Sequence, residues 1–157
     1  MMTIAKSVGM ALMLVITCFL TACHPLRASL NETLPPSFNF RSGFAECCNF
    51  LTFFRVEEVV AENQSLPWLR SKPKENIALW EVWAEGNNSG HVPAVITYGK
   101  VPSGFVQKIP QSGAPPDLIE GRVYDAYGPP SLVPETYIRF TIRDGKAVRL
   151  PVPGKDY

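Results

Sequence analysis

Proline and glycine interrupt this chain so often that few stretches leave room for a long helix. The sequence has 15 prolines and 11 glycines among 157 residues, and few runs of helical length have helical periodicity. Proline disrupts a helix interior, whereas both residues are favoured in turns. Short strands joined by many turns are therefore the expected architecture. The length suits one domain with a sizeable core.

Several runs have the composition of β-strands. β-Branched and aromatic residues are concentrated in 50–60, and residues 77–84 are almost continuously apolar, which is typical of a strand covered on both faces. Residues 92–98 follow a loop rich in glycine and asparagine, so we expect a β-hairpin over 77–98. Further strand candidates are 105–109, 118–124, 137–143 and 146–152.

The last two strand candidates meet at Asp144-Gly145, which leaves two registers open. A two-residue turn would pair Phe140 with Arg149 and put a charge beside the apolar face. A three-residue loop, with Gly145 left-handed in a bulge, would pair Phe140 with Val148. Because a slip of one residue reverses every side chain, we expect the second register.

The spacing Leu118-x-x-Gly121-x-x-Tyr124 resembles the tyrosine corner of fibronectin type III and immunoglobulin-like domains. The resemblance implies that the Tyr124 hydroxyl bonds back to upstream backbone, with Gly121 in the turn and Leu118 against the core. It implies an all-β fold, a single antiparallel β-sandwich of immunoglobulin-like or Greek-key type with about seven strands. More strand candidates follow the motif than in that family, so the strand order stays open.

The N-terminal segment has the parts of an export signal. Lys6 precedes an apolar run from Val8 to Phe19, whose 12 residues fall short of the roughly 20 that a spanning helix needs. The following Leu20-Thr21-Ala22-Cys23 resembles the lipobox of bacterial lipoproteins. The resemblance implies that the Cys23 thiol receives a diacylglyceryl group, that the chain is cut before it, and that the new amine is acylated.

The lipoprotein resemblance also implies a location. Residue 24 is His and not the Asp that this family uses for inner-membrane retention, so we expect a lipid anchor at the periplasmic face of the outer membrane. Residues 1–22 would be the cleaved signal peptide, 23–37 a flexible tether containing three prolines, and 38–157 the β-sandwich domain. The chain is also similar to small uncharacterised bacterial lipoproteins, a class that implies no shared activity.

Cys47 and Cys48 remain once the signal is removed and Cys23 is lipidated. In an oxidising compartment, three arrangements are open: a vicinal disulfide, a bridge from one of them to another chain, or two buried thiols. Ordinary disulfide geometry does not fit adjacent residues with an unstrained peptide, so a vicinal bridge would stiffen a turn.

Charge and motifs favour a non-enzymatic protein. Lys6 is the one charged residue of 1–22, so 14 of the 15 basic residues remain against 14 acidic ones, which gives no electrostatic case for nucleic acid. The sequence has no zinc, EF-hand, P-loop or G-x-S-x-G motif, so we expect no catalytic residue, metal or cofactor. Glu81 is the best acid for one alternative function, an envelope-polymer hydrolase.

We therefore expect a lipid-anchored binding or structural module, held at the membrane by its lipid, with another envelope protein as a candidate partner. Stiff proline-rich loops lose little entropy on binding, which makes them the candidate partner surface. A second alternative is a carrier of an apolar ligand, lined by Trp80 and Trp83. The residues of the candidate partner surface are Val101, Pro102, Pro115, Pro116, Tyr127, Pro129 and Pro130.

Replacing Cys23 tests the lipid anchor. We expect Cys23→Ala to lose the lipid mass and to move into the soluble envelope fraction, because no thiol remains to carry the acyl chains. Mass spectrometry and membrane fractionation measure both effects. An unchanged mass together with unchanged membrane partition would contradict the lipoprotein assignment.

Overall fold

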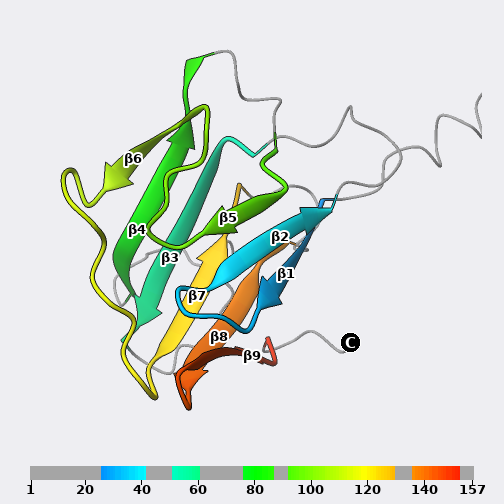
Figure 1. Cartoon of the computed structure of the whole chain (residues 1–157), viewed down its shortest axis with the longest axis vertical. Coiled ribbons are helices and arrows are strands. Elements are labelled where there is room, and N and C mark those ends of the chain that lie inside the picture. The colour runs from blue at the N-terminus through cyan, green and yellow to red at the C-terminus, as the bar shows by residue number, and fades with distance from the viewer. Residues whose placement is uncertain (1–25, 42–50, 61–75, 87–91, 130–135, 153–157) are drawn as a thin grey trace, which may run out of the picture.

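The computed structural model describes residues 26–41, 51–60, 76–86, 92–129 and 136–152. Within these ranges the protein is all-β, and its strands form two antiparallel sheets that face each other (Figure 1). The β-sandwich expected from the sequence is confirmed. The strands are β1 (Arg27–Asn31), β2 (Ser37–Arg41), β3 (Phe53–Val59), β4 (Asn76–Ala84), β5 (Val95–Thr97), β6 (Phe105–Ile109), β7 (Val123–Tyr127), β8 (Ile138–Arg143) and β9 (Lys146–Leu150).

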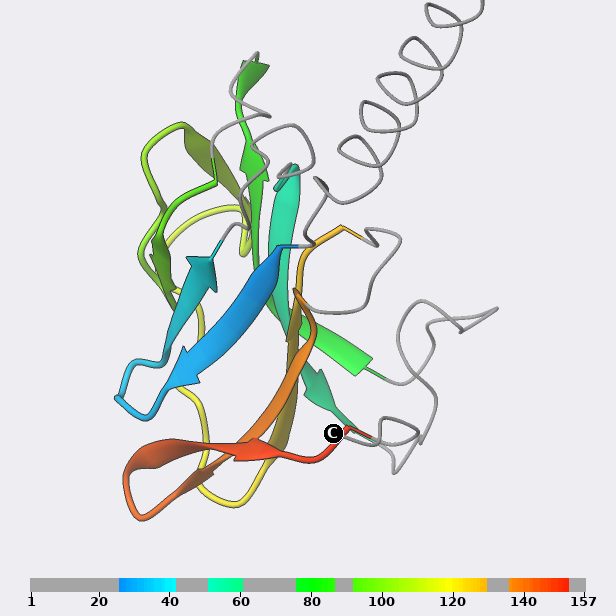
Figure 2. The same ribbon diagram turned by 90° about the vertical axis from the view of Figure 1, so that its right-hand side faces the viewer.

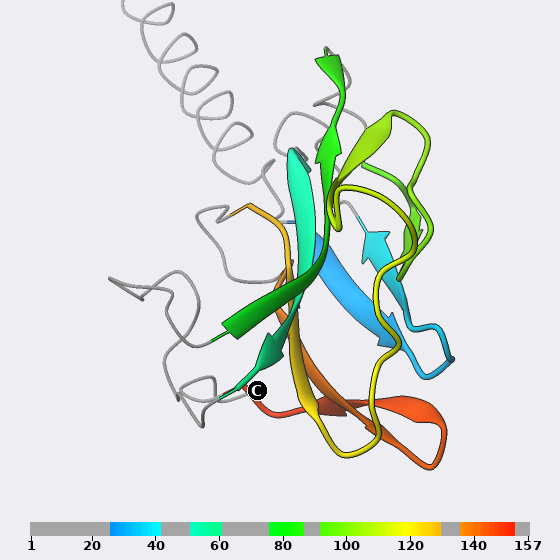
Figure 3. The same cartoon turned by 90° about the vertical axis from the view of Figure 1, so that its left-hand side faces the viewer.

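The two sheets differ in size. The small sheet has the order β1-β2-β5, and the large sheet has the order β6-β4-β3-β7-β8-β9. Figure 2 and Figure 3 show the small sheet lying as a separate layer against the large one. Strand β1 contacts β8 and β9 across this division.

The prediction of a β-hairpin over 77–98 is wrong. Strand β4 pairs with β3 and β6 in the large sheet, whereas β5 pairs with β2 in the small sheet. The chain thus changes layer after β4 and returns at β6. A loop rich in glycine and asparagine is compatible with either path, so local composition did not distinguish a hairpin from a crossing between layers.

Part of the expected tether is folded. Arg27–Asn31 form β1 and pair with β2, although they were expected to lie in the flexible tether 23–37. Ala28 is buried and Leu30 packs against the core. The alternation of inward and outward side chains was easy to miss in this strand, because the inward side chain of Ala28 is only a methyl group. Folded structure therefore begins before the expected residue 38.

The core between the sheets is dominated by aromatic rings. Phe38 of the small sheet lies 4.9 Å from Phe54 and 5.8 Å from Phe140, both in the large sheet, measured between ring centroids. Phe54 also meets Trp80, whose ring packs edge-on against Tyr98. Such tilted and edge-to-face pairs contribute roughly 0.5–1.5 kcal/mol beyond the burial of their area.

The hydrogen bond that defines a tyrosine corner is present. The Tyr124 hydroxyl accepts a hydrogen bond from the backbone N–H of Ile119 at 2.7 Å, and Gly121 has a φ of +78°. Only glycine adopts this φ without steric cost, which explains its place in the turn. Leu118 packs against the core from a partly buried position. The corner expected from this motif is confirmed. The expected number of about seven strands is too low, since the described residues form nine strands.

The register expected for the last hairpin is wrong. Phe140 pairs with Arg149, and the chain turns through Asp144 and Gly145 alone. Both turn residues have positive φ, 52° and 71°, which is the geometry of a type I′ turn and the one that Asp-Gly favours. The charge of Arg149 is tolerated because β9 is an edge strand, where a long side chain reaches water.

Removing the Tyr124 hydroxyl tests the contribution of the corner. We expect Tyr124→Phe to lower the free energy of unfolding by about 1 kcal/mol, because one hydrogen bond is lost while the ring stays packed. Urea unfolding measures this, with an unchanged slope showing that the same surface unfolds. A variant as stable as the wild type would contradict a structural role for the hydroxyl.

Candidate functional site

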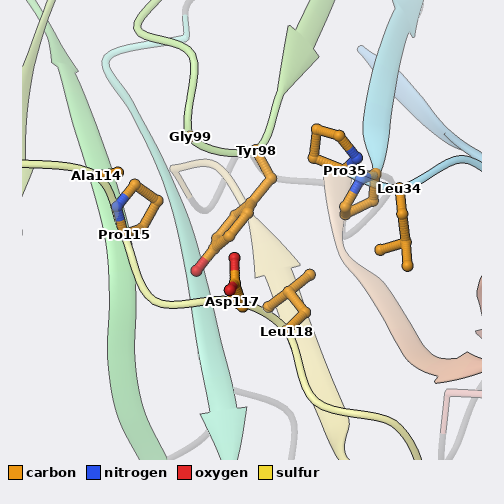
Figure 4. Close-up of a pocket in the computed structure, with 9 residues that line it drawn as sticks. Leu34, Pro35, Tyr98, Gly99, Ala114, Pro115, Asp117 and Leu118 are labelled. Carbon is orange, nitrogen blue, oxygen red and sulfur yellow. The ribbon is translucent and has the colours of Figure 1, made fainter. Parts of the chain in front are cut away.

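A pocket of about 420 Å³ opens where three connections meet. The connections are the turn between β1 and β2, the residues directly after β5, and the loop between β6 and β7 (Figure 4). The volume lies within the range of ligand sites in proteins. The lining residues are Leu34, Pro35, Pro36, Tyr98, Gly99, Ala114, Pro115, Asp117 and Leu118.

The β6–β7 loop is held in place by side chains at several points. The Gln107 amide donates to the carbonyl oxygens of Pro110 and Gly113, at 2.8 and 2.9 Å. The Tyr98 hydroxyl donates to the carbonyl oxygen of Pro116 at 2.8 Å, and the Tyr124 corner holds Ile119. These contacts fix the wall of the pocket although the segment forms no long strand.

Tyr98 and Asp117 give the pocket its polar groups. Figure 4 shows the Tyr98 hydroxyl pointing toward the Asp117 carboxylate, and Leu118 and Pro35 also line the pocket. Burial, with contributions from the nearby Tyr124 and Asp117, raises the pKa of Tyr98 well above its usual range, so the hydroxyl stays neutral. Asp117 itself is exposed and forms no ion pair within the described part of the chain.

The residues of the expected partner surface lie in different places. Pro115 lines the pocket, and Pro116 supplies the carbonyl that Tyr98 binds. Val101 is exposed and Pro102 partly buried in the turn that leads to β6. Tyr127 and Pro129, at the end of β7, do not line this pocket. Leu34–Pro36 also line the pocket, but they were expected to belong to the tether and were not predicted as site residues.

Glu81 lies on the outer face of the large sheet, away from the core. Its carboxylate accepts from the Arg55 guanidinium and from the Trp83 indole N–H, the latter at 2.5 Å. Both carboxylate oxygens therefore have a donor. Glu81 is buried and does not line the pocket, so its geometry favours the ion-paired interpretation over the hydrolase alternative.

Further polar groups continue this outer-face network. Glu57 accepts from the Asn76 amide at 2.5 Å and from the Tyr127 hydroxyl at 3.0 Å. Burial and the Glu57 carboxylate raise the pKa of Tyr127 to about 12, which keeps its proton available for this bond. Asp125 and Arg139 form a buried bidentate pair, at 2.7 and 2.9 Å. Its hydrogen bonds raise the pKa of Arg139, against the effect of burial.

The two tryptophans of β4 have separate environments. Trp80 is fully buried between the sheets, whereas Trp83 is 42% exposed on the outer face and stacks on Phe53 at 5.5 Å. They do not form a joint platform, because the two rings lie on opposite faces of β4, and neither of them lines the pocket described above. This arrangement gives no support to the ligand carrier lined by both rings.

Several expected features fall outside the described residues. They are the signal peptide 1–22, the lipidation site Cys23, the pair Cys47 and Cys48, and Pro130. Within the described ranges, no three His, Cys, Asp or Glu side chains gather as a metal site would require. No helix in those ranges is long and apolar enough to cross a bilayer.

Comparisons with known proteins give no match. No family model fits the chain, and no curated protein or solved structure is significantly similar to it.

The buried pair Asp125–Arg139 offers a test of the outer-face network. Asp125 is fully buried, so we expect Arg139→Ala to lower the free energy of unfolding by about 3–5 kcal/mol, because it leaves a buried carboxylate without its guanidinium. Urea unfolding with a linear fit measures the change.

Arg122→Ala is the matched control, at the residue directly before β7 of the same sheet. Arg122 pairs with Glu58 but has a side chain that is 51% exposed, so we expect a loss under about 1 kcal/mol. The double variant Asp125→Leu/Arg139→Met should recover much of the stability, since no buried charge remains. Equal losses for Arg139→Ala and Arg122→Ala would contradict the proposed importance of the buried pair.

Proposed function

We propose that this protein is a lipid-anchored module of the bacterial envelope that binds another envelope protein through the pocket defined above. The observation that carries the proposal is a preformed pocket on a β-sandwich, with three prolines in its lining and a pinned loop as one wall. Loops on a rigid scaffold are the usual place for recognition. A pocket that exists before binding costs little ordering entropy.

The N-terminal sequence supports the anchored part of the proposal. Leu20-Thr21-Ala22-Cys23 has the lipobox pattern, and an acylated Cys23 would keep the domain close to a membrane. Because only a few residues separate Cys23 from β1, the anchored domain would lie near the bilayer surface. Its partner would then be a membrane protein or a protein held close to the membrane.

A protein ligand fits the lining better than a chemical substrate does. The lining is mainly apolar, and its polar side chains are Tyr98 and Asp117. The Trp80 indole N–H donates to the Gln107 side-chain oxygen at 3.1 Å, and the Arg55 guanidinium donates to the Glu81 carboxylate. None of these four side chains lines the pocket. The pocket thus offers shape and a carboxylate, and its lining contains no serine, cysteine or histidine for the nucleophile and base that acyl transfer of the triad type uses.

Position-specific crosslinking in intact cells tests the proposal. A photoreactive amino acid in place of Ala114, which is exposed at the pocket, should give one protein adduct in the membrane fraction. The same amino acid at Arg143, an exposed position on β8 that does not line the pocket, is the matched control and should not give that adduct. Gel shifts and mass spectrometry detect the product.

Two results would overturn this function. One is the absence of any protein adduct at position 114 while the variant is folded and membrane-bound. The other is the same set of adducts from positions 114 and 143, which would indicate collision and not docking.

A further inference from the structure

The pocket combines apolar walls with a carboxylate that lacks a counterion within the described residues. Leu34, Pro35 and Leu118 provide aliphatic surface, and Asp117 adds a negative charge at the rim. Elsewhere in the described chain, the outer-face acids have donors: Glu81 has Arg55, and Asp125 has Arg139. An exposed carboxylate beside apolar surface favours a ligand with a cationic head on an aliphatic stem.

A second acceptor lies next to this carboxylate. The Tyr98 hydroxyl gives its hydrogen to the carbonyl of Pro116, so its oxygen keeps lone-pair capacity for an incoming donor. Figure 4 shows the Tyr98 hydroxyl pointing toward the Asp117 carboxylate, whose charge also contributes to the raised pKa of Tyr98. Two neighbouring acceptors suit a group that offers several N–H donors in one plane.

Among protein side chains, the guanidinium group meets this requirement best. It presents five N–H donors in a rigid planar fork, whereas the ammonium of lysine is a compact and more strongly hydrated charge. The three methylene groups of an arginine stem would lie against the proline and leucine surface. The remaining volume leaves room for neighbouring residues of the same ligand.

We infer that the pocket recognises an arginine side chain of the partner protein, with the guanidinium held by the Asp117 carboxylate and the Tyr98 hydroxyl oxygen. This inference rests on the proposed function, since it names the group that the partner inserts. The prolines would limit motion of the walls, so that the pocket selects by charge and by the length of the side chain.

Peptide titration of the full-length protein in detergent, followed by NMR, tests the inference. The probe is acetyl-Ala-Arg-Ala-amide. It should shift the amide signals of Gly99, Ala114 and Leu118, and the affinity should fall as salt rises because Asp117 is exposed. The matched peptide with citrulline, which keeps the shape of arginine without its charge, should bind about tenfold more weakly. The lysine peptide should lie between them.

Protein variants identify the group responsible. Asp117→Asn should lower the affinity for the arginine peptide about tenfold and leave the affinity for the citrulline peptide unchanged. Glu85→Gln removes the same charge from an exposed residue that does not line the pocket, and it should change neither affinity. Thermal unfolding of both variants checks that the fold is retained.

Three outcomes would overturn the inference: equal binding of the arginine and citrulline peptides, an unchanged affinity in Asp117→Asn, or no shift with any peptide. The crosslinking experiment separates these from a failure of the proposed function. If position 114 still gives its specific adduct in cells while none of the peptides binds as expected, the docking site is supported and arginine recognition is contradicted. If neither experiment gives a signal, both the docking site and arginine recognition are contradicted.

Discussion

The packing of Phe38 against Phe54 and Phe140 is the contact on which the rest of the structure depends. Phe38 is fully buried, and it is the ring that joins the three-stranded sheet to the centre of the six-stranded one. A sheet of three strands has little core of its own, so the small sheet gains its stability by burying this face. The position of the β1–β2 turn, and with it Pro35 in the pocket wall, follows from that packing.

Two hydrogen-bonded tyrosines, Tyr98 directly after β5 and Tyr124 on β7, hold the other wall of the pocket in place. Tyr124 packs beside Phe140 in the core and binds the backbone at Ile119, while Tyr98 packs on Trp80 and binds Pro116. Each ring thus joins the aromatic core to one point of the β6–β7 loop. The pocket lies between that loop and the β1–β2 turn, so both of its walls are tied to the same cluster of rings.

Local patterns predicted local features well. The strand predicted within 50–60 is observed as β3, and the tyrosine corner is also present. Both predictions came from local signals, the β-branched and aromatic composition of 50–60 and the Gly121–Tyr124 spacing. The hairpin over 77–98 failed because the choice between layers depends on distant partners. The predicted register at Asp144-Gly145 was wrong because it assumed that β9 is covered and that Arg149 would be costly to bury there. β9 is an edge strand, and Arg149 pairs with Phe140. The pocket was found in part: Pro115 was identified, but Tyr98 and Pro35 come from distant segments that no local pattern joins.

Cross-sheet nuclear Overhauser effects test the central packing directly. Ring protons of Phe38 should give cross-peaks with those of both Phe54 and Phe140, whose centroids lie 4.9 and 5.8 Å away. The Tyr124–Phe140 pair, at 5.4 Å within the large sheet, is the internal reference. If the reference peak is present and both Phe38 peaks are missing, the two sheets do not pack as described and the walls of the pocket are not brought together.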